Sequence, residues 1–434
     1  MLTKEESDLL CQTGRGTPCG ELMRRYWQPV ALSEEVTAEG APLTVRLFGE
    51  DLVLFRDRQG RAGLLDLHCP HRGADLSYGR VEDRGIRCIY HGWLLDINGR
   101  CLDQPAEPAG RDQCASIRQP AYPCVERSGM IFTYLGPGEP PLLPNYDFLT
   151  CTDEHVFATK LFSETNFLQA NEGNIDLVHN NFLHFVKRDL ESLNPTEARE
   201  ALERFGAPQV LSGRGPAPGL ESTDAQLLDY GMRIYKIRQM EDGGTYLRVA
   251  TYVLPNLTVI PAGNINWHVP IDDTHHWKYI IRFDRDRPID KEKCRADRLI
   301  SATADYKPIA NKANRYLQDR EAMKKAIYSG ISPKHFQSQD LCPIETAGPV
   351  QDRTREHLVA NDMPIIISRK LLLRAIQNLQ KNGLEPRNVA RRPEQNYFPE
   401  IVALFGPVPK SKTYKEYCDE LARKHQGWQT RQRV

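Results

Sequence analysis

Short apolar runs separated by turns dominate the chain from about residue 28 to residue 150. Runs of this length, bounded by Gly, Pro, Asn and Asp, are typical of β-strands in an all-β domain. Strands are predicted at residues 43–48, 52–56, 63–66, 94–100 and 130–135. The first two flank Gly49-Glu50-Asp51, so the sequence predicts a hairpin there.

The second half of the chain mixes strand and helix patterns. Strands are predicted at residues 156–161, 233–238, 246–254, 258–262, 264–270 and 277–283. Four of them follow one another through short connections, which indicates an antiparallel meander. Helices are predicted at residues 291–318, 353–358, 368–381 and 414–425, so this half reads as an α+β domain. Residues 186–228 are rich in Pro, Gly and charge, and we expect them to form a mobile cover.

Two further features set the limits of these parts. Residues 3–26 predict two short helices, the second of which begins with Thr17 as N-cap and Pro18 in the first turn. The Pro/Gly cluster at 136–141 is the clearest linker in the chain. The expected division is a helical segment at 1–27, a β domain at 28–145 and an α+β domain at 146–434.

Charge and composition narrow the class of protein. The 434 residues include 57 Lys and Arg against 57 Asp and Glu, and the pI is about 7.2. This balance argues against nucleic acid or an acidic membrane as the main partner. No apolar run approaches the roughly 20 residues of a membrane span, and the N-terminus has no signal-peptide core. We therefore expect a cytoplasmic protein whose eleven cysteines are mostly free thiols.

Two short segments of the β domain each combine one cysteine with one histidine. They read Cys69-x-His71 and Cys88-x-x-His91, with sixteen residues between the two pairs. In a Rieske [2Fe–2S] cluster two cysteines hold one iron and two histidines hold the other. Two loops that each supply one thiolate and one imidazole suit this cluster.

A structural zinc site with two cysteines and two histidines is the alternative. Zinc ligands usually come as Cys-x2–4-Cys and His-x3–5-His, whereas each segment here mixes the two types. The mixing favours the iron cluster. Gly73 and Gly92 allow the backbone to turn close to the metal. His68 lies outside the spacing of the two Cys/His pairs and is not expected to bind the metal.

Residues 172–184 place two carboxylates and two histidines among apolar residues that recur at spacings of three, four and seven. This periodicity predicts a helix with one buried face. His179 and His184 would lie about 140° apart on a regular helix. Both reach one metal only if the helix breaks, and Asn180-Asn181 are poor helix formers at the required place. Two imidazoles and a carboxylate form the facial triad of non-haem iron; the alternative is a polar rim on an ordinary core helix.

With these motifs the chain resembles the Rieske non-haem iron oxygenases, the terminal oxygenases of ring-hydroxylating and O-demethylating systems. The four residues of the cluster motif match, and Asp176, His179 and His184 match the family's Asp-x2-His-x4-His iron motif. Residues 166–169 and 269–273 resemble the branch of phthalate dioxygenase and the aryl O-demethylases. The resemblance implies an all-β Rieske domain followed by a helix-grip-like catalytic domain, an antiparallel sheet flanked by helices.

The resemblance also implies roles for residues far apart in the sequence. Asp340, 156 residues after His184, stands where the family has its third iron ligand; Glu345 is the second choice and His335 a structural residue. Asp176 is similar to the aspartate that links a cluster histidine of one subunit to an iron-binding histidine of the next. It also stands one turn before the first iron histidine, where it can hydrogen-bond the imidazole. Electron transfer between subunits requires a head-to-tail ring, so a homotrimer is expected.

The implied reaction uses dioxygen, electrons from an NAD(P)H-dependent reductase with flavin and iron–sulfur groups, and a small aromatic substrate with a carboxylate. It is either ring hydroxylation or dihydroxylation, or aryl O-demethylation. Arg238 and Arg248 lie on predicted strands and are candidates for the carboxylate anchor, although a surface position is the more frequent role of such residues. Glu172 either shares the subunit interface or is an exposed helix residue.

Two other classes of protein remain as alternatives. One is a Rieske electron-transfer protein without oxygenase chemistry, which would hold two irons. The other is a colourless binding module stabilised by zinc.

Overall fold

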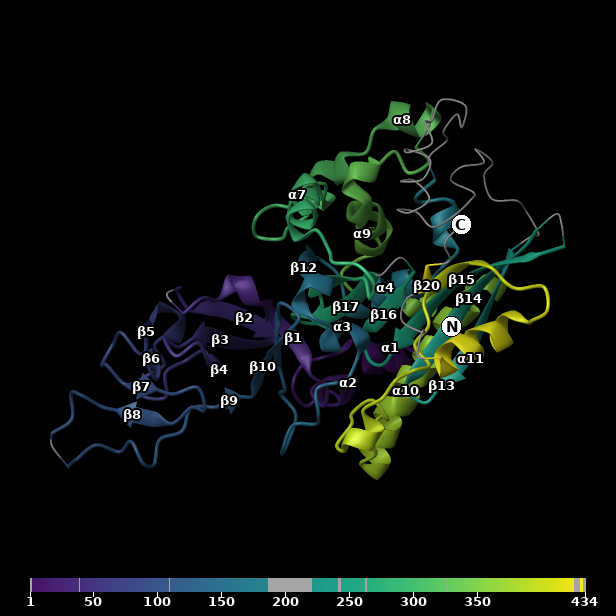
Figure 1. Cartoon of the computed structure of the whole chain (residues 1–434). Helices are drawn as coiled ribbons and strands as arrows, with labels where there is room; N and C mark the ends of the chain where they lie inside the picture. The colour runs from purple at the N-terminus through teal and green to yellow at the C-terminus, as the bar shows by residue number, and fades with distance from the viewer. Residues whose placement is uncertain are drawn as a thin grey trace.

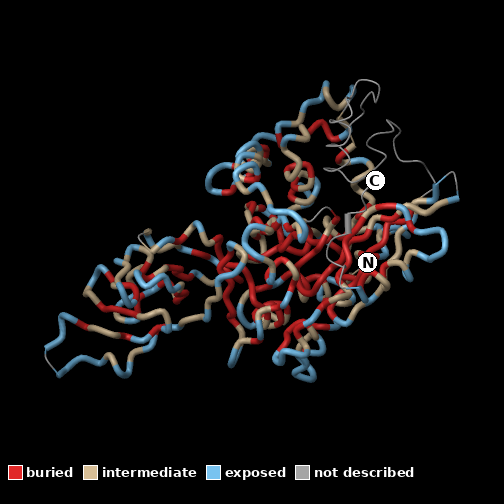
Figure 2. The backbone as a smooth tube through the Cα atoms, in the orientation of Figure 1, coloured by how far each residue is buried: buried red, intermediate tan, exposed pale blue. Residues whose placement is uncertain are grey.

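The computed structural model describes residues 2–185 except 39 and 109, residues 221–424 except 241, 242, 262, 263 and 326, and the backbone of 430 and 431. A β-rich domain forms one end of the molecule, and a larger domain built on one long antiparallel sheet forms the other (Figure 1). Buried backbone is concentrated along this sheet (Figure 2). The predicted fold class, an all-β domain followed by an α+β domain, is confirmed.

Two short helices open the chain, α1 (Lys4–Cys11) and α2 (Pro18–Met23). The Thr17 side chain accepts a hydrogen bond from the backbone of Gly20, so α2 begins with the predicted N-cap. Both helices pack against α10 (Met363–Asn382) of the larger domain. The beginning of the chain is therefore held by its longest C-terminal helix.

The N-terminal β domain contains three small antiparallel sheets, with strand orders β1-β11-β10, β2-β3-β4-β9 and β5-β6-β7-β8. The strands are β1 (Gln28–Leu32), β2 (Leu43–Leu47), β3 (Glu50–Arg56), β4 (Ala62–Asp66), β5 (Arg80–Glu82), β6 (Gly85–Arg87), β7 (Leu94–Leu95), β8 (Cys101–Asp103), β9 (Ala121–Tyr122), β10 (Cys124–Arg127) and β11 (Met130–Thr133). The sheet β5–β8 lies at the end of the molecule remote from the large sheet (Figure 1).

Two details of this domain differ from the prediction. The β2–β3 hairpin turns at Phe48-Gly49, where both residues have positive φ (53° and 79°), as a two-residue hairpin turn requires. The predicted strand at 94–100 is limited to β7, because the Asp96 side chain accepts the backbone N–H of Arg100 at 2.8 Å and closes a turn.

The large sheet has the strand order β12-β18-β17-β16-β15-β14-β13, with β19 paired to β15 and β20 to β19. Its strands are β12 (Val156–Ser163), β13 (Glu221–Leu228), β14 (Gly231–Gln239), β15 (Thr245–Val253), β16 (Leu257–Ile260), β17 (Asn264–Pro270), β18 (His276–Phe283), β19 (Leu404–Pro407) and β20 (Thr430–Arg431). All six predicted strands are present. The mobile cover predicted at 186–228 is wrong at its end, where β13 pairs with β14 along its whole length; residues 186–220 lie outside the described residues.

Helices surround this sheet: α3 (Asp147–Thr150), α4 (Phe167–Ile175), α7 (Lys291–Ser301), α8 (Arg320–Lys325), α9 (Phe336–Thr346), α10 and α11 (Tyr414–Arg423). The long helix predicted at 291–318 is wrong beyond Ser301, since Ala302 is extended (φ −137°, ψ 152°) and ends the helix. The helix predicted at 353–358 is only the 3₁₀ turn Arg353–Arg355. No helix among the described residues has the length and apolar character needed to cross a membrane; the cytoplasmic location stays a prediction.

The position of α4 matters most for the metal site. This helix packs on β16 and β17 with one face and contacts α9 with another. The segment after α4 and the helix α9 are thereby held together over the large sheet.

Candidate metal centres

The break that frees the two histidines comes at Asp176, the C-cap of α4. Its Oδ1 accepts the backbone N–H groups of Val178 (2.8 Å) and His179 (3.2 Å). An aspartate that binds nearby backbone N–H groups competes with the helix and ends it. The break therefore lies before the predicted Asn180-Asn181, and the following residues form the 3₁₀ turn His179–Asn181.

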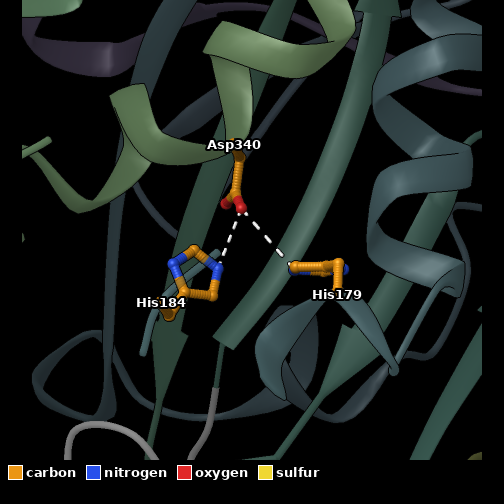
Figure 3. Close-up of side chains that lie close together, drawn as sticks. All are labelled: His179, His184 and Asp340. Atoms are coloured by element: carbon orange, nitrogen blue, oxygen red, sulfur yellow. Dashed lines mark ion pairs between the residues drawn. The ribbon is translucent and has the colours of Figure 1, made fainter. Parts of the chain in front are cut away.

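Three side chains converge beyond this break. The Nε2 atoms of His184 and His179 lie 3.0 and 3.6 Å from the same oxygen, Oδ1 of Asp340 (Figure 3). One ligand atom of each residue lies within 4.8 Å of the others. Ligand atoms bound about 2.1 Å from a metal lie roughly 3 Å apart. The turn after α4 and the helix α9 thus present two imidazoles and one carboxylate to a common point.

Gln339, which the sequence analysis did not identify, fixes the orientation of His184. The Gln339 Nε2 donates to the backbone carbonyl of Ile331 at 2.6 Å, so its Oε1 must face the imidazole. That oxygen lies 2.7 Å from the His184 Nδ1, which therefore carries the proton. The lone pair of Nε2 then points toward Asp340, as a metal ligand requires.

The charges at this point also suit a cation. Burial lowers the pKa of His179, so the imidazole is in the neutral form that binds metals. Burial by itself would raise the pKa of Asp340, but His184, Lys278 and His179 hold it well below its usual range. His179 is thus a neutral donor beside an ionised carboxylate.

Glu345, the second choice for the carboxylate ligand, is occupied elsewhere. Its Oε1 accepts the backbone N–H of Glu164 at 3.0 Å and the hydroxyl of Ser163 at 3.3 Å. Its Oε2 accepts the Tyr316 hydroxyl at 2.6 Å. These contacts tie α9 to β12 and to the segment before α8.

Two acidic residues of the segment differ from expectation. The Asp176 Oδ2 lies 3.9 Å from the His179 Nδ1, which is too far for the expected hydrogen bond, and its side chain is 31% exposed. Glu172 is buried and accepts hydrogen bonds from Arg353 (3.1 Å) and Arg369 (2.7 and 3.1 Å). The prediction of an exposed or interface residue is wrong, because two guanidinium groups enclose its carboxylate.

A cavity of about 180 Å³ is lined by two of the three converging side chains, His179 and Asp340. Its polar lining includes Asp176, His179, His268, His276, Lys278 and Asp340. Its apolar wall includes Ala170, Leu183, Leu341, Pro343 and Ile344. Neither Arg238 nor Arg248 lines this cavity, so the cation that borders it is a lysine that sequence reasoning missed.

In the β domain, two tight turns carry the cysteines. The N–H of Gly73 donates to the carbonyl of Cys69 (2.9 Å), and the N–H of Gly92 donates to the carbonyl of Cys88 (3.0 Å). Both glycines have positive φ, 75° and 76°, which other residues adopt at a cost. Both cysteines are buried. The two turns have the same local geometry, as two halves of one binding site would.

The histidines of these turns lie beside each other, with the ring centroids of His71 and His91 4.4 Å apart. The His71 Nδ1 is buried and has no hydrogen-bond partner among the described residues, although His71 stacks on Trp93 at 4.5 Å. A buried ring nitrogen without a partner fits a metal ligand. Burial raises the pKa of Cys69 to about 11, and a bound cation would keep this thiol deprotonated.

Comparisons with known proteins show the family of this chain. A model of the Rieske [2Fe-2S] domain matches residues 26–123, and a model described as LigXa C-terminal domain like matches residues 133–431. Phthalate 4,5-dioxygenase oxygenase subunit of Pseudomonas putida is 36% identical over 88% of this chain and 87% of its own length. The chain belongs to the Rieske non-haem iron oxygenases. This oxygenase therefore carries a Rieske [2Fe–2S] cluster and a mononuclear iron, and it is the terminal oxygenase component of its system.

Another relative has a different named reaction. The oxygenase is 30% identical to 5,5'-dehydrodivanillate O-demethylase oxygenase subunit of Sphingobium sp. (strain NBRC 103272 / SYK-6), over 91% of this chain and 85% of that one. The terminal oxygenase of carbazole 1,9a-dioxygenase from Novosphingobium sp. KA1 has the same fold, with a TM-score of 0.52, 20% identity and coverage of 87% and 97%. The alternatives of an electron-transfer protein and a zinc module are not favoured.

Proposed function

We propose that this oxygenase oxidises a single-ring aromatic carboxylate. The observation that carries the proposal is the cavity of about 180 Å³ beside His179 and Asp340, which has an apolar wall and a buried cation. This volume is below the roughly 300–1,000 Å³ of sites for drug-sized ligands, and it suits one aromatic ring. Relatives whose names include phthalate and 3-chlorobenzoate support the class of substrate.

His179, His184 and Asp340 would hold the mononuclear iron, and Cys69, His71, Cys88 and His91 would hold the cluster. When bound, the cluster supplies single electrons and the mononuclear iron activates dioxygen. Gln339 keeps the lone pair of His184 directed at the iron site, at a distance of 2.7 Å from the Nδ1. The apolar wall of the cavity excludes water from the substrate ring.

Subunit contacts complete the proposed site. The sheet β5–β8, whose β6–β7 turn carries Cys88 and His91, lies far from the large sheet within one chain (Figure 1). A head-to-tail homotrimer would place the β domain of one subunit beside the catalytic domain of the next. The partly exposed Asp176 would then hydrogen-bond a cluster histidine across the interface. We propose that each subunit is divided into a helical segment at 1–27, the Rieske domain at 28–145 and the catalytic domain at 146–434.

The electron donor would be an NAD(P)H-dependent reductase with flavin and iron–sulfur groups, and dioxygen would be the oxidant. Structures of carbazole 1,9a-dioxygenase include a complex of oxygenase and ferredoxin, which supports a separate donor protein here.

A turnover screen tests the proposed function. The purified oxygenase is combined with NADH and a surrogate reductase, and offered phthalates, benzoates and methoxylated benzoates under air. We expect at least one acid to be consumed with matched uptake of dioxygen. Diols identify ring dihydroxylation, and formaldehyde identifies O-demethylation. Reduction of the cluster without consumption of any acid would overturn the proposal.

A further inference from the structure

Three lysines of the large sheet are buried, and their partners differ. Lys160 forms an ion pair of 2.8 Å with Glu35, and Lys236 forms one of 3.3 Å with Glu221. Lys278 is 6% exposed and has no carboxylate partner among the residues that the structure describes. Buried charges in proteins are normally paired. Lys278 is therefore the one of these three without an ion pair at contact distance, since Asp340, the carboxylate that acts on its charge, lies beyond that distance.

The surroundings of Lys278 show where a counterpart would bind. Its Nζ donates one hydrogen bond, of 2.7 Å, to the Gln337 Oε1 on α9. An ammonium group has three N–H donors, so two remain for a ligand. Lys278 stands directly opposite His268 in the β17–β18 ladder, and both border the cavity beside Asp340.

No carboxylate among the described residues of the cavity lining contacts the Lys278 ammonium, although Asp340 acts on its charge from a longer distance. His276 donates from Nδ1 to the carbonyl of Thr165 (2.7 Å) and pairs with His268 at 3.2 Å; burial lowers its pKa to about 4. Both histidines are therefore neutral. Asp340 faces the two iron-site histidines, and Asp176 accepts backbone N–H groups.

We propose that Lys278 is the residue that selects acids over neutral aromatics, by donating two hydrogen bonds to the substrate carboxylate. The aromatic ring then lies against Ala170, Leu341 and Ile344, with its reacting carbon toward the point between His179 and Asp340. This inference rests on the proposed function, because it names the group that recognises the substrate's charge. It assigns the anchor to β18 rather than to Arg238 or Arg248.

The test compares acids with amides of the same shape. Calorimetry under nitrogen measures binding of 3-methoxybenzoate, 3-methoxybenzamide, phthalate and phthalamide to the holoenzyme. We expect the wild-type enzyme to bind at least one acid more tightly than its amide. Lys278→Met, which keeps the length and removes the charge, should raise the Kd of that acid by roughly 10- to 100-fold. It should leave the Kd of the amide within about twofold, because the neutral amide carries no charge that could pair with the Lys278 ammonium.

Two controls keep the result interpretable. Lys278→Arg should recover most of the affinity for the acid, and iron content with the visible spectrum of the cluster reports an intact enzyme. If Lys278→Met is unfolded, the Lys278→Gln variant and the wild-type preference for the acid decide the matter. Equal losses for acid and amide, or no wild-type preference for any acid, overturn the inference. Acids that bind through Lys278 without being oxidised contradict only the proposed function.

Discussion

The two metal sites of this oxygenase are built in opposite ways. The candidate cluster ligands lie between residues 69 and 91, on two tight turns that each close with one backbone hydrogen bond. The candidate iron ligands come from the turn after α4 and from α9, and Asp340 lies 156 positions after His184. The cluster site depends on local backbone geometry, whereas the iron site depends on the packing of two distant helices.

This difference determines how far from each metal site the residues that stabilise its geometry lie. At the iron site, Glu172 joins α4 to Arg353 and Arg369, and Glu345 joins α9 to β12. The ion pairs beside the cluster turns span fewer residues, since Arg87, next to Cys88, pairs with Glu82 and Asp103, and the turn glycines provide the conformation. Breaking the Glu172 contacts should therefore disturb the iron from a distance, while the cluster should respond mainly to changes within its turns.

The largest expected effect separates the two sites. His184→Ala should lose the mononuclear iron. Turnover should then fall by at least about 10³-fold, because the chemistry needs a bound metal with open coordination positions. The visible spectrum and sulfide content of the cluster should stay unchanged. Cys88→Ala should do the reverse and remove both cluster irons. Loss of the cluster spectrum in His184→Ala would contradict the independence of the sites.

Removing the buried charge of Glu172 should come next in size. Glu172→Gln leaves Arg353 without its carboxylate partner and Arg369 with Glu356 alone, and breaking such a buried pair costs about 3–5 kcal/mol. The free energy of unfolding in urea at pH 7 measures this loss. As a control, Glu292→Gln removes an exposed partner of Arg295 and should leave the midpoint unchanged.

The pH dependence of the Glu172 contribution follows from its pKa. Burial opposes ionisation, but the guanidinium groups of Arg353 and Arg369 outweigh it and lower the pKa of Glu172. A lowered pKa in the folded state gives stability that is complete above about pH 4.3 and is lost as pH falls through the folded-state value. The difference between wild type and Glu172→Gln should shrink below that pH, and a constant difference would contradict this assignment.

A smaller effect is expected at Gln339. Gln339→Leu removes the acceptor that orients His184, and loss of such a contact typically weakens metal affinity about 10- to 100-fold. Titration of iron-depleted protein with Fe(II) measures the change. Gln337→Leu on the same helix is the matched control, since Gln337 contacts Lys278 and neither histidine. Equal losses in both variants would show a general effect on α9.

The smallest effect tests the cluster turns. Gly73→Ala and Gly92→Ala both force alanine into positive φ, which costs about 1–2 kcal/mol. A Cβ at Gly92 would also meet the Pro105 ring at 2.8 Å, whereas at Gly73 nothing lies within 4 Å. Thermal denaturation followed at the cluster absorbance should show a larger loss for Gly92→Ala. Equal Tm values would remove the role assigned to Pro105.

The sequence was sufficient where the determinants are local. The periodicity of β17 is visible over residues 264–270, and the Cys/His spacing defines both cluster turns. It was insufficient where a contact spans the chain. The partners of Glu172 lie 181 and 197 residues downstream, so its burial left no local signal.

Two other elements had weak local signals for physical reasons. The polar sequence of β13 lacks alternation because the strand lies at the edge of the sheet. The helix α9 contains Pro343, which usually argues against a helix, and so the support for Asp340 came from resemblance alone. Gln339 and Lys278 became visible only when α9 and β18 were placed beside the histidines.

The most direct test of the account is the iron content of two charge-removing variants on α9, Asp340→Asn and Glu345→Gln. Iron and acid-labile sulfide are measured per chain after desalting of reconstituted protein. The account predicts three irons and two sulfides in the wild type and in Glu345→Gln, but two irons and two sulfides in Asp340→Asn. A full third iron in Asp340→Asn, or its loss only in Glu345→Gln, would contradict the iron site described here.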